Sequence, residues 1–111
     1  MKLEYLETAQ PGLRWFQRYY RENPQLRKAA ALAAFRKARG LIKDNPFLGH
    51  AFEGMEQVRE YSIQGTHFSI LYTVRRDTIW VIDIRDARGL RSAEALRRFA
   101  AELRQRLRGE R

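Results

Sequence analysis

The sequence predicts an α+β fold in which a two-helix hairpin packs on an antiparallel sheet. Two observations support this prediction. First, most of the β-branched and aromatic residues lie in three runs within residues 57–86, separated by short polar breaks at 64–66 and 75–77. Second, the segments before and after these runs repeat apolar residues at helical spacing. Three such runs joined by short turns are typical of a three-stranded meander.

The strands of this meander are expected to be covered on both faces, at least in part. In the third run Trp80 and Ile82 share one parity, while Ile79 and Val81 share the other, so apolar residues occur on both sides. Strands buried on two faces show this near-continuous apolar pattern. Helices before and after the meander must supply the cover, and a partner chain could supply the rest.

A short strand and two helices are predicted ahead of the meander. Residues 2–7 alternate polar and apolar, which indicates a strand at an edge of the sheet. A first helix follows, with Thr8 as the expected N-cap, and ends near residues 23–24, since proline disfavours a helical residue before it. A second helix is expected from Pro24 to about Lys43. Its predicted buried stripe is rich in alanine: Ala31, Ala34, Phe35, Ala38, Leu41 and Ile42.

The remaining segments complete the order β-α-α-β-β-β-α in one domain spanning residues 1–111. Residues 47–56 are expected to form a loop that Phe47, Leu48 and Phe52 pin to the core. After the meander, a turn leads to a basic final helix over residues 92–108, capped by Ser92.

Composition limits the classes of function. The chain has no cysteine, so disulfides and thiol catalysis are excluded, and its two histidines are too few for a zinc site without several carboxylates. No segment has the roughly 20 apolar residues of a membrane span, and no signal peptide is recognisable, so a cytoplasmic protein without metal or cofactor is expected. The net charge of +9 is concentrated in the predicted helices, because residues 13–43 carry nine Lys or Arg against Glu22 alone. Basic faces favour nucleic acid, the ribosome or an acidic protein as partner.

Several short motifs occur in a fixed order along the chain. Asn-Pro at 23–24 opens the second helix, NPFLG at 45–49 closes it, VRE at 58–60 opens the meander, GTHFSILY at 65–72 lies in its middle, and Arg88 follows its last strand. In this order and spacing, the motifs resemble the RelE/ParE family of bacterial toxins over roughly residues 3–90.

The resemblance implies the toxin of a type II toxin–antitoxin pair, bound and neutralised by a cognate antitoxin in a hetero-oligomer. RelE-like members of the family cut mRNA in the ribosomal A site without a metal, whereas ParE-like members poison DNA gyrase and have no known catalytic residues. The long helical hairpin closed by the NP-x-LG turn is more similar to the ParE-like branch. The expected target is therefore DNA gyrase, with the ribosome and its mRNA as the alternative.

Under the RelE-like alternative, the candidate catalytic residues are Arg59, Arg88 and His67. Metal-free RNA cleavage needs a base, an acid and a cation that stabilises the phosphate, and the arginine fork suits the last task. Arg59 and Arg88 occupy positions where the family commonly has arginine and could face a common groove. Ser69 departs from the family pattern, which frequently reads Gly-x-Tyr-Arg, so a central phosphate-binding arginine is missing. A structural alternative for Arg59 is a salt bridge with an acid such as Asp83.

The residues expected to bind a target or nucleic acid are Arg14, Trp15 and Arg18, together with Arg85. Aromatic and basic residues interleaved on a helix can stack on bases and hold phosphates. The alternative is that the aromatics are core and the arginines only solvate the helix, and that Arg85 forms a local ion network with Asp86 and Arg88. A third hypothesis for the whole chain is a toxin fold that serves only as an interaction module without toxicity.

Overall fold

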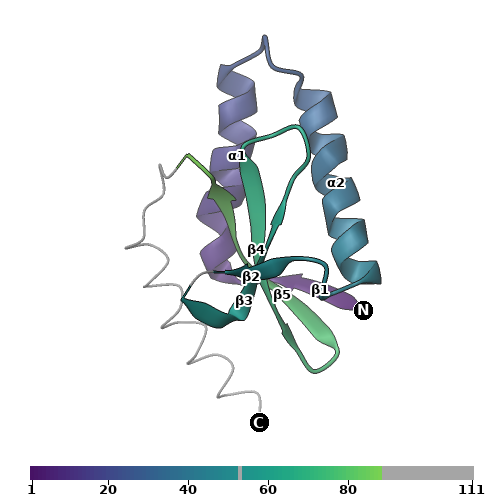
Figure 1. Cartoon of the computed structure of the whole chain (residues 1–111). Coiled ribbons are helices and arrows are strands. Elements are labelled where there is room, and N and C mark those ends of the chain that lie inside the picture. Colours follow the sequence, from purple (N-terminus) through teal and green to yellow (C-terminus); the bar gives the residue numbers. More distant parts are fainter. Residues whose placement is uncertain (53, 89–111) are drawn as a thin grey trace.

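The computed structural model describes residues 1–52 and 54–88, in which two α-helices pack on one face of a five-stranded sheet (Figure 1). The elements are, in chain order, β1 (Lys2–Tyr5), the 3-10 helix η1 (Glu7–Ala9), α1 (Gln10–Glu22), α2 (Lys28–Asp44), β2 (His50–Phe52), β3 (Met55–Ser62), β4 (Phe68–Arg75) and β5 (Thr78–Asp86). The predicted α+β class is confirmed. The final helix predicted over residues 92–108 lies outside the described residues.

The sheet has the strand order β1-β5-β4-β3-β2, with β4 in the centre. Strands β3, β4 and β5 are antiparallel neighbours, so the predicted meander is confirmed. Strand β1 pairs with β5 at the edge, as expected, and runs parallel to it, with Lys2 opposite Thr78. At the other edge, β2 pairs with β3, and this short hairpin replaces the predicted loop over residues 47–56.

The start of α1 differs from the prediction. Thr8 is not an N-cap, because it lies inside η1 and its hydroxyl donates a hydrogen bond to the carbonyl oxygen of Ile82 at 2.7 Å. The pairing of β4 with β5 shifts register at this point, which leaves Ile82 as an extra residue in β5. A bulged residue loses its ladder partner, so the Thr8 hydroxyl satisfies a carbonyl that the sheet does not.

The two helices end where the sequence indicated, but the second begins at Lys28 and not at Pro24 as predicted. At the end of α1, the side-chain amide of Asn23 donates to the carbonyl oxygen of Tyr19 at 2.8 Å. Residues 23–26 then form a turn, closed by the hydrogen bond from Leu26 N to Asn23 O at 2.9 Å, and α2 begins at Lys28. Neither of the described helices is long and apolar enough to span a membrane.

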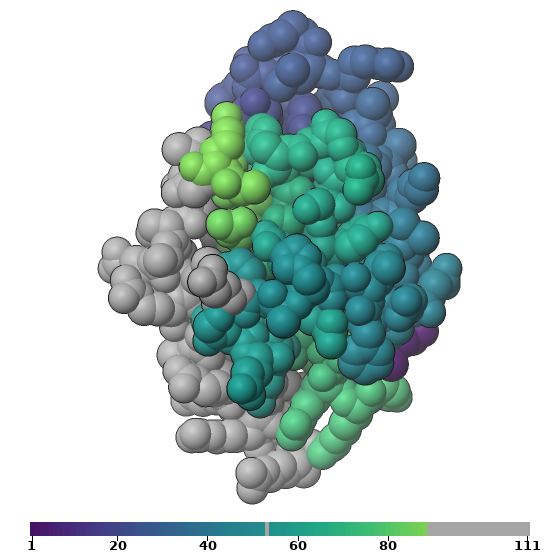
Figure 2. Space-filling view, in the orientation of Figure 1, coloured from purple at the N-terminus to yellow at the C-terminus, as the bar shows by residue number. Residues whose placement is uncertain are grey.

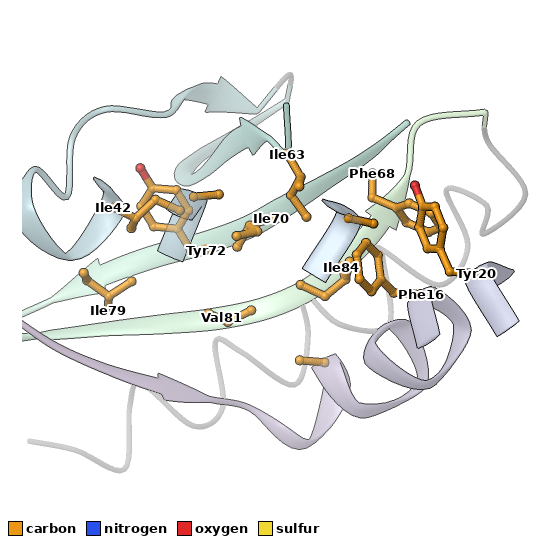
Figure 3. Packing of buried hydrophobic residues seen from close by; sticks show 13 residues of the cluster. Phe16, Tyr20, Ile42, Ile63, Phe68, Ile70, Tyr72, Ile79, Val81 and Ile84 are labelled. Carbon is orange, nitrogen blue, oxygen red and sulfur yellow. The ribbon is translucent and has the colours of Figure 1, made fainter. Parts of the chain in front are cut away.

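The main core lies between the helices and the sheet. Phe16 of α1 packs on Phe68 of β4 in an edge-to-face arrangement, with ring centroids 4.9 Å apart, and on Phe35 of α2 at 5.5 Å. Figure 3 shows Phe16 and Tyr20 of α1 beside Phe68 of β4 and Ile84 of β5, with the other apolar side chains of these strands following in a row. From α2, only Ala31, Ala38 and Ile42 of the predicted stripe are buried, and Leu41 is 38% exposed.

The opposite face of the sheet carries a second, smaller apolar cluster. Its buried members are Leu6, Val58, Leu71 and Ile82, with Phe52, Met55 and Trp80 packed at their side. The expectation of apolar cover on both faces is therefore confirmed. Trp80 is half-buried, and its indole nitrogen has no hydrogen-bond partner among the described residues.

Polar contacts, not apolar side chains, hold the turn between α2 and β2. Phe47 and Leu48 are 63% and 40% exposed, so their predicted anchoring role is wrong, whereas Phe52 packs against the smaller apolar cluster as predicted. Instead, the buried hydroxyl of Tyr72 donates to Pro46 O at 2.8 Å and accepts the Gly49 N–H at 2.9 Å. Gly49 is enclosed so tightly that an added Cβ would lie 2.7 Å from the Tyr72 hydroxyl oxygen. Glycine is thus required here by close packing.

We predict opposite effects on stability for alanine at two glycines. Gly49→Ala should lower the free energy of unfolding by about 1–3 kcal/mol, the usual effect of overpacking, since its Cβ also approaches Glu60 O to 2.9 Å. Gly40→Ala, in α2 with open space around it, should raise the free energy by roughly 0.5–1 kcal/mol. Urea unfolding followed by circular dichroism measures both. Equal effects at the two positions would contradict the packing described here.

Candidate functional site

The end of β5 holds a buried carboxylate that gathers side chains from α1 and from the chain beyond the strand. Asp86 is fully buried, and its Oδ2 accepts hydrogen bonds from the Trp15 indole Nε1 at 3.1 Å and from Arg88 Nη2 at 2.8 Å. Its Oδ1 accepts hydrogen bonds from the backbone N–H and from Nε of Arg88, both at 3.0 Å. A buried charge is tolerated when donors surround it in this way.

These donors keep Asp86 ionised. Burial raises its pKa, but the hydrogen bonds from the Arg88 side chain, the Trp15 indole and the Arg88 backbone N–H outweigh burial and lower the pKa from 3.8 to about 2. The same pairing raises the pKa of Arg88. Both groups are therefore charged throughout the physiological pH range.

Asp86 also fixes the orientation of Arg88 and of Trp15, and each of these takes part in a cation–π contact at the surface. The guanidinium carbon of Arg88 lies 4.8 Å from the centroid of the Tyr19 ring, and that of Arg18 lies 4.9 Å from the centroid of the Trp15 ring. Each is a cation–π contact. Figure 1 shows the end of β5 reaching α1 at this point, and Figure 2 shows the chain near residue 88, coloured yellow-green, at the molecular surface.

An open groove of about 450 Å³ runs along the outer face of α1 next to this cluster. It is lined by Pro11, Arg14, Trp15, Gln17, Arg18 and Arg21. Arg18 has a distant ion pair with Glu22, at 3.8 Å, with both side chains more than half exposed. Within residues 1–52 and 54–88, neither Arg14 nor Arg21 forms a salt bridge. The groove is therefore a basic surface that the described acidic residues neutralise only slightly.

His67 lies at the edge of the same cluster, between aromatic rings. Its ring centroid is 4.6 Å from that of Tyr19 and 4.4 Å from that of Phe68. Burial lowers the pKa of His67 below 6.5; the charge of Asp86 acts in the opposite direction, and that of Arg88 lowers the pKa further. His67 is therefore neutral at pH 7, and its Nε2, 3.7 Å from Asp86 Oδ1, is buried without a hydrogen bond in the described part of the chain.

The other face of the sheet has a second polar network, centred on Glu60. Its Oε2 accepts hydrogen bonds from the Ser69 hydroxyl at 2.6 Å and from Arg85 Nη1 at 3.0 Å, and its Oε1 lies 3.4 Å from His50 Nε2. The guanidinium of Arg85 also lies over the Phe52 ring, 5.6 Å from its centroid. An acid therefore lies beside Ser69, the residue at which the sequence departs from the family pattern.

Arg59 is bound to the backbone of the turn after α2. Its Nη1 donates to Gly49 O at 2.6 Å and to Phe47 O at 3.3 Å, and its guanidinium lies 5.1 Å from the centroid of the Phe47 ring. The alternative considered for Arg59, a salt bridge with an acid such as Asp83, is not found, because the Arg59 guanidinium binds these two carbonyls. Together with Tyr72, Arg59 stabilises this turn.

The structure brings together some of the predicted site residues and separates others. Trp15, Arg18 and Arg88 lie in one cluster with His67. Arg59 does not share a groove with Arg88. Its cross-strand neighbour Tyr72 is four residues from Phe68, which pairs with Asp86, and four residues of strand span about 13 Å.

Arg85 is also separated from the α1 cluster. Successive strand residues point to opposite faces, so Arg85 joins Glu60 on one face while Asp86 meets Trp15 on the other. The expected ion network of Arg85, Asp86 and Arg88 is therefore confirmed only for the last two.

The sequence analysis did not identify Asp86 as the residue that organises this cluster. The usable signal was an acidic residue ending an apolar strand, with a tryptophan in the first helix whose indole N–H needs an acceptor when it is buried. Nothing in the spacing of Trp15 and Asp86, 71 residues apart, joins them before the fold is known. Among the described residues, no group of three His, Asp or Glu side chains is placed to hold a metal ion.

Comparison with protein-family models identifies the family of this chain. The family model described as the ParE toxin of the type II toxin–antitoxin system parDE matches residues 3–91. The chain belongs to the ParE toxin family. No curated protein matches the chain. The resemblance found in the motifs is thereby confirmed, and membership implies an antitoxin as partner of this ParE-family toxin.

We predict that Asp86 supports stability in a pH-dependent way. Because its pKa is lower in the folded chain than its ordinary 3.8, the carboxylate stabilises the fold above about pH 4, and this contribution is lost as the pH falls toward 2. Its size is about 2 kcal/mol by linkage. Asp86→Asn should lower the free energy of unfolding at pH 7 by about that amount and flatten its dependence between pH 5 and 2.

Urea unfolding at a series of pH values measures this dependence. Asp77→Asn is the matched control, since Asp77 is an exposed carboxylate in the turn between β4 and β5. This control should keep the acid-induced loss. The role assigned to Asp86 is wrong if Asp86→Asn retains the full loss of stability in acid.

Proposed function

We propose that this ParE-family toxin inhibits growth by binding DNA gyrase and that a cognate antitoxin neutralises it. The family match supports this proposal, because ParE-like members of the wider RelE/ParE group poison gyrase, whereas RelE-like members cut mRNA. The single structural observation that favours it most is the use of the candidate catalytic arginines in internal contacts. Arg59 binds two backbone carbonyls and Arg88 binds Asp86.

The positions of His67, Ser69 and Arg59 do not suit the cleavage of mRNA. A general acid or base must reach the proton that it transfers, but His67 Nε2 is buried between Tyr19 and Phe68. A phosphate at Ser69 would meet the carboxylate of Glu60, 2.6 Å from the Ser69 hydroxyl. Arg59 lies about 13 Å along the sheet from the His67 end. These placements support action by binding.

The RelE-like alternative keeps one favourable feature. Arg88, with a side chain 41% exposed, and neutral His67 both lie next to Asp86. If binding to the ribosome exposed His67, its imidazole could act as the base and Arg88 could bind the phosphate, since both lie next to Asp86. In that case Arg88 and His67, without Arg59, would form the site.

The proposal is tested by assaying gyrase and the ribosome side by side. Purified toxin should inhibit supercoiling of relaxed plasmid by gyrase, and the antitoxin encoded beside it should restore activity. Relaxation of supercoiled plasmid by a type I topoisomerase should be unaffected. In a translation extract, primer extension should show no new mRNA ends.

Variants separate the two targets further. Under the binding proposal, His67→Gln should inhibit gyrase as strongly as the wild type, provided that circular dichroism shows the same fold. Cleavage of mRNA that His67→Gln abolishes, with gyrase unaffected by the wild type, would replace the proposal by the RelE-like alternative. If expression is harmless and neither assay responds, the chain is an interaction module.

A further inference from the structure

We propose that the outer face of α1 binds the phosphate backbone of duplex DNA through Arg14, Arg18 and Arg21. Phosphate binding at this face is inferred from the arrangement of its side chains. The choice of DNA as the duplex rests on gyrase as the proposed target, because a toxin bound to gyrase lies beside DNA.

The spacing of the three arginines places them in a row. Residues 14, 18 and 21 follow the i, i+4, i+7 pattern of one helix face, and all three are exposed. At 1.5 Å per residue the row is about 10 Å long. Phosphates of one DNA strand recur every 3.4 Å along the duplex axis, so side chains in a row of this length can reach more than one phosphate.

The charge of this face is available to a ligand. Arg14 and Arg21 have no salt bridge within the part of the chain that the structure describes, and the pair of Arg18 with Glu22 is long, at 3.8 Å, and solvent-exposed. Exposed pairs of this kind contribute little. A guanidinium group can donate two parallel hydrogen bonds to a phosphate. Within the described part of the chain, the cations of Arg14 and Arg21 are thus free to exchange water and counterions for a polyanion.

The state of Trp15 favours a duplex over a single strand. Single strands bind by stacking their bases on exposed aromatic faces. In this chain, the Trp15 indole is fixed by its hydrogen bond to Asp86, and the Arg18 guanidinium lies over its ring at 4.9 Å. That ring face is therefore already occupied, and the groove presents cations without a stacking platform.

The same features disfavour an acidic protein as the ligand. A protein interface needs an apolar centre that is desolvated on binding. Among the described residues, the apolar lining of the groove consists of Pro11 and the covered Trp15, and the other lining side chains are Arg14, Gln17, Arg18 and Arg21. Phosphates need no such centre.

Fluorescence anisotropy of the full chain with a labelled DNA duplex, without gyrase or antitoxin, tests the proposal. The triple variant Arg14→Gln, Arg18→Gln, Arg21→Gln should bind at least about ten-fold more weakly at low salt, and its slope of log K against log salt should be shallower by about 2.7. The matched control removes the same charge from exposed positions of α2 by Arg36→Gln, Lys37→Gln and Lys43→Gln. It should bind within about two-fold of the wild type.

A gain of binding excludes misfolding as the explanation. Glu22→Gln removes the acid nearest the row and should tighten binding a few-fold. Single-stranded DNA and duplex RNA of equal length, and polyglutamate, should each bind more weakly than the DNA duplex.

The proposal is overturned if the α1 and α2 triple variants lose affinity equally, which would make net charge the cause. It is also overturned if Glu22→Gln has no effect, or if single strands, duplex RNA or polyglutamate bind as tightly as duplex DNA. A gyrase assay on the α1 variant keeps the two proposals apart. Loss of DNA binding with gyrase inhibition intact would support this site and leave the gyrase proposal standing.

Discussion

One buried carboxylate organises the surface where we place the function of this chain. Asp86 ends β5 beneath α1, and its charge is stable there only because Trp15 and Arg88 donate hydrogen bonds to it. In return, the carboxylate fixes the indole on which Arg18 rests and the guanidinium that lies on Tyr19. The positions of Trp15, Arg18 and Arg88 beside α1 therefore depend on one ionised group.

The two polar networks neutralise two of the cations that lie close to the sheet. On one face, Glu60 accepts hydrogen bonds from Arg85 and from the Ser69 hydroxyl. On the other face, Asp86 forms a salt bridge with Arg88. Arg59 is bound to carbonyl oxygens. These cations hold turns and strand ends in place, which is why basic residues near the sheet do not amount to a phosphate-binding site. Their positions in the sequence resemble those of catalytic arginines, but each has a structural partner.

The sequence predicted the elements better than the contacts among them. Period-two alternation and the Asn-Pro stops located the meander and the ends of both helices, because these signals are local. The anchoring of the turn after α2 was predicted wrongly, since a polar bond from Tyr72 replaces the contact expected from Phe47. Likewise, the local ion network considered for Arg85, Asp86 and Arg88 forms only between the last two, because Arg85 meets Glu60 on the other face. Such partners come from segments distant in sequence, and spacing carries no information about them.

The stability of α1 does not account for its row of arginines. Like charges three or four residues apart on a helix destabilise it by roughly 0.2–0.5 kcal/mol per pair, and Arg14, Arg18 and Arg21 form two such pairs. Glu22 relieves this repulsion only weakly, through a 3.8 Å contact in solvent. Solvation of the helix would be served equally by mixed charges, as on most protein surfaces. A row of one sign, next to a tryptophan held in place by a buried acid, is better explained by a negatively charged ligand than by folding.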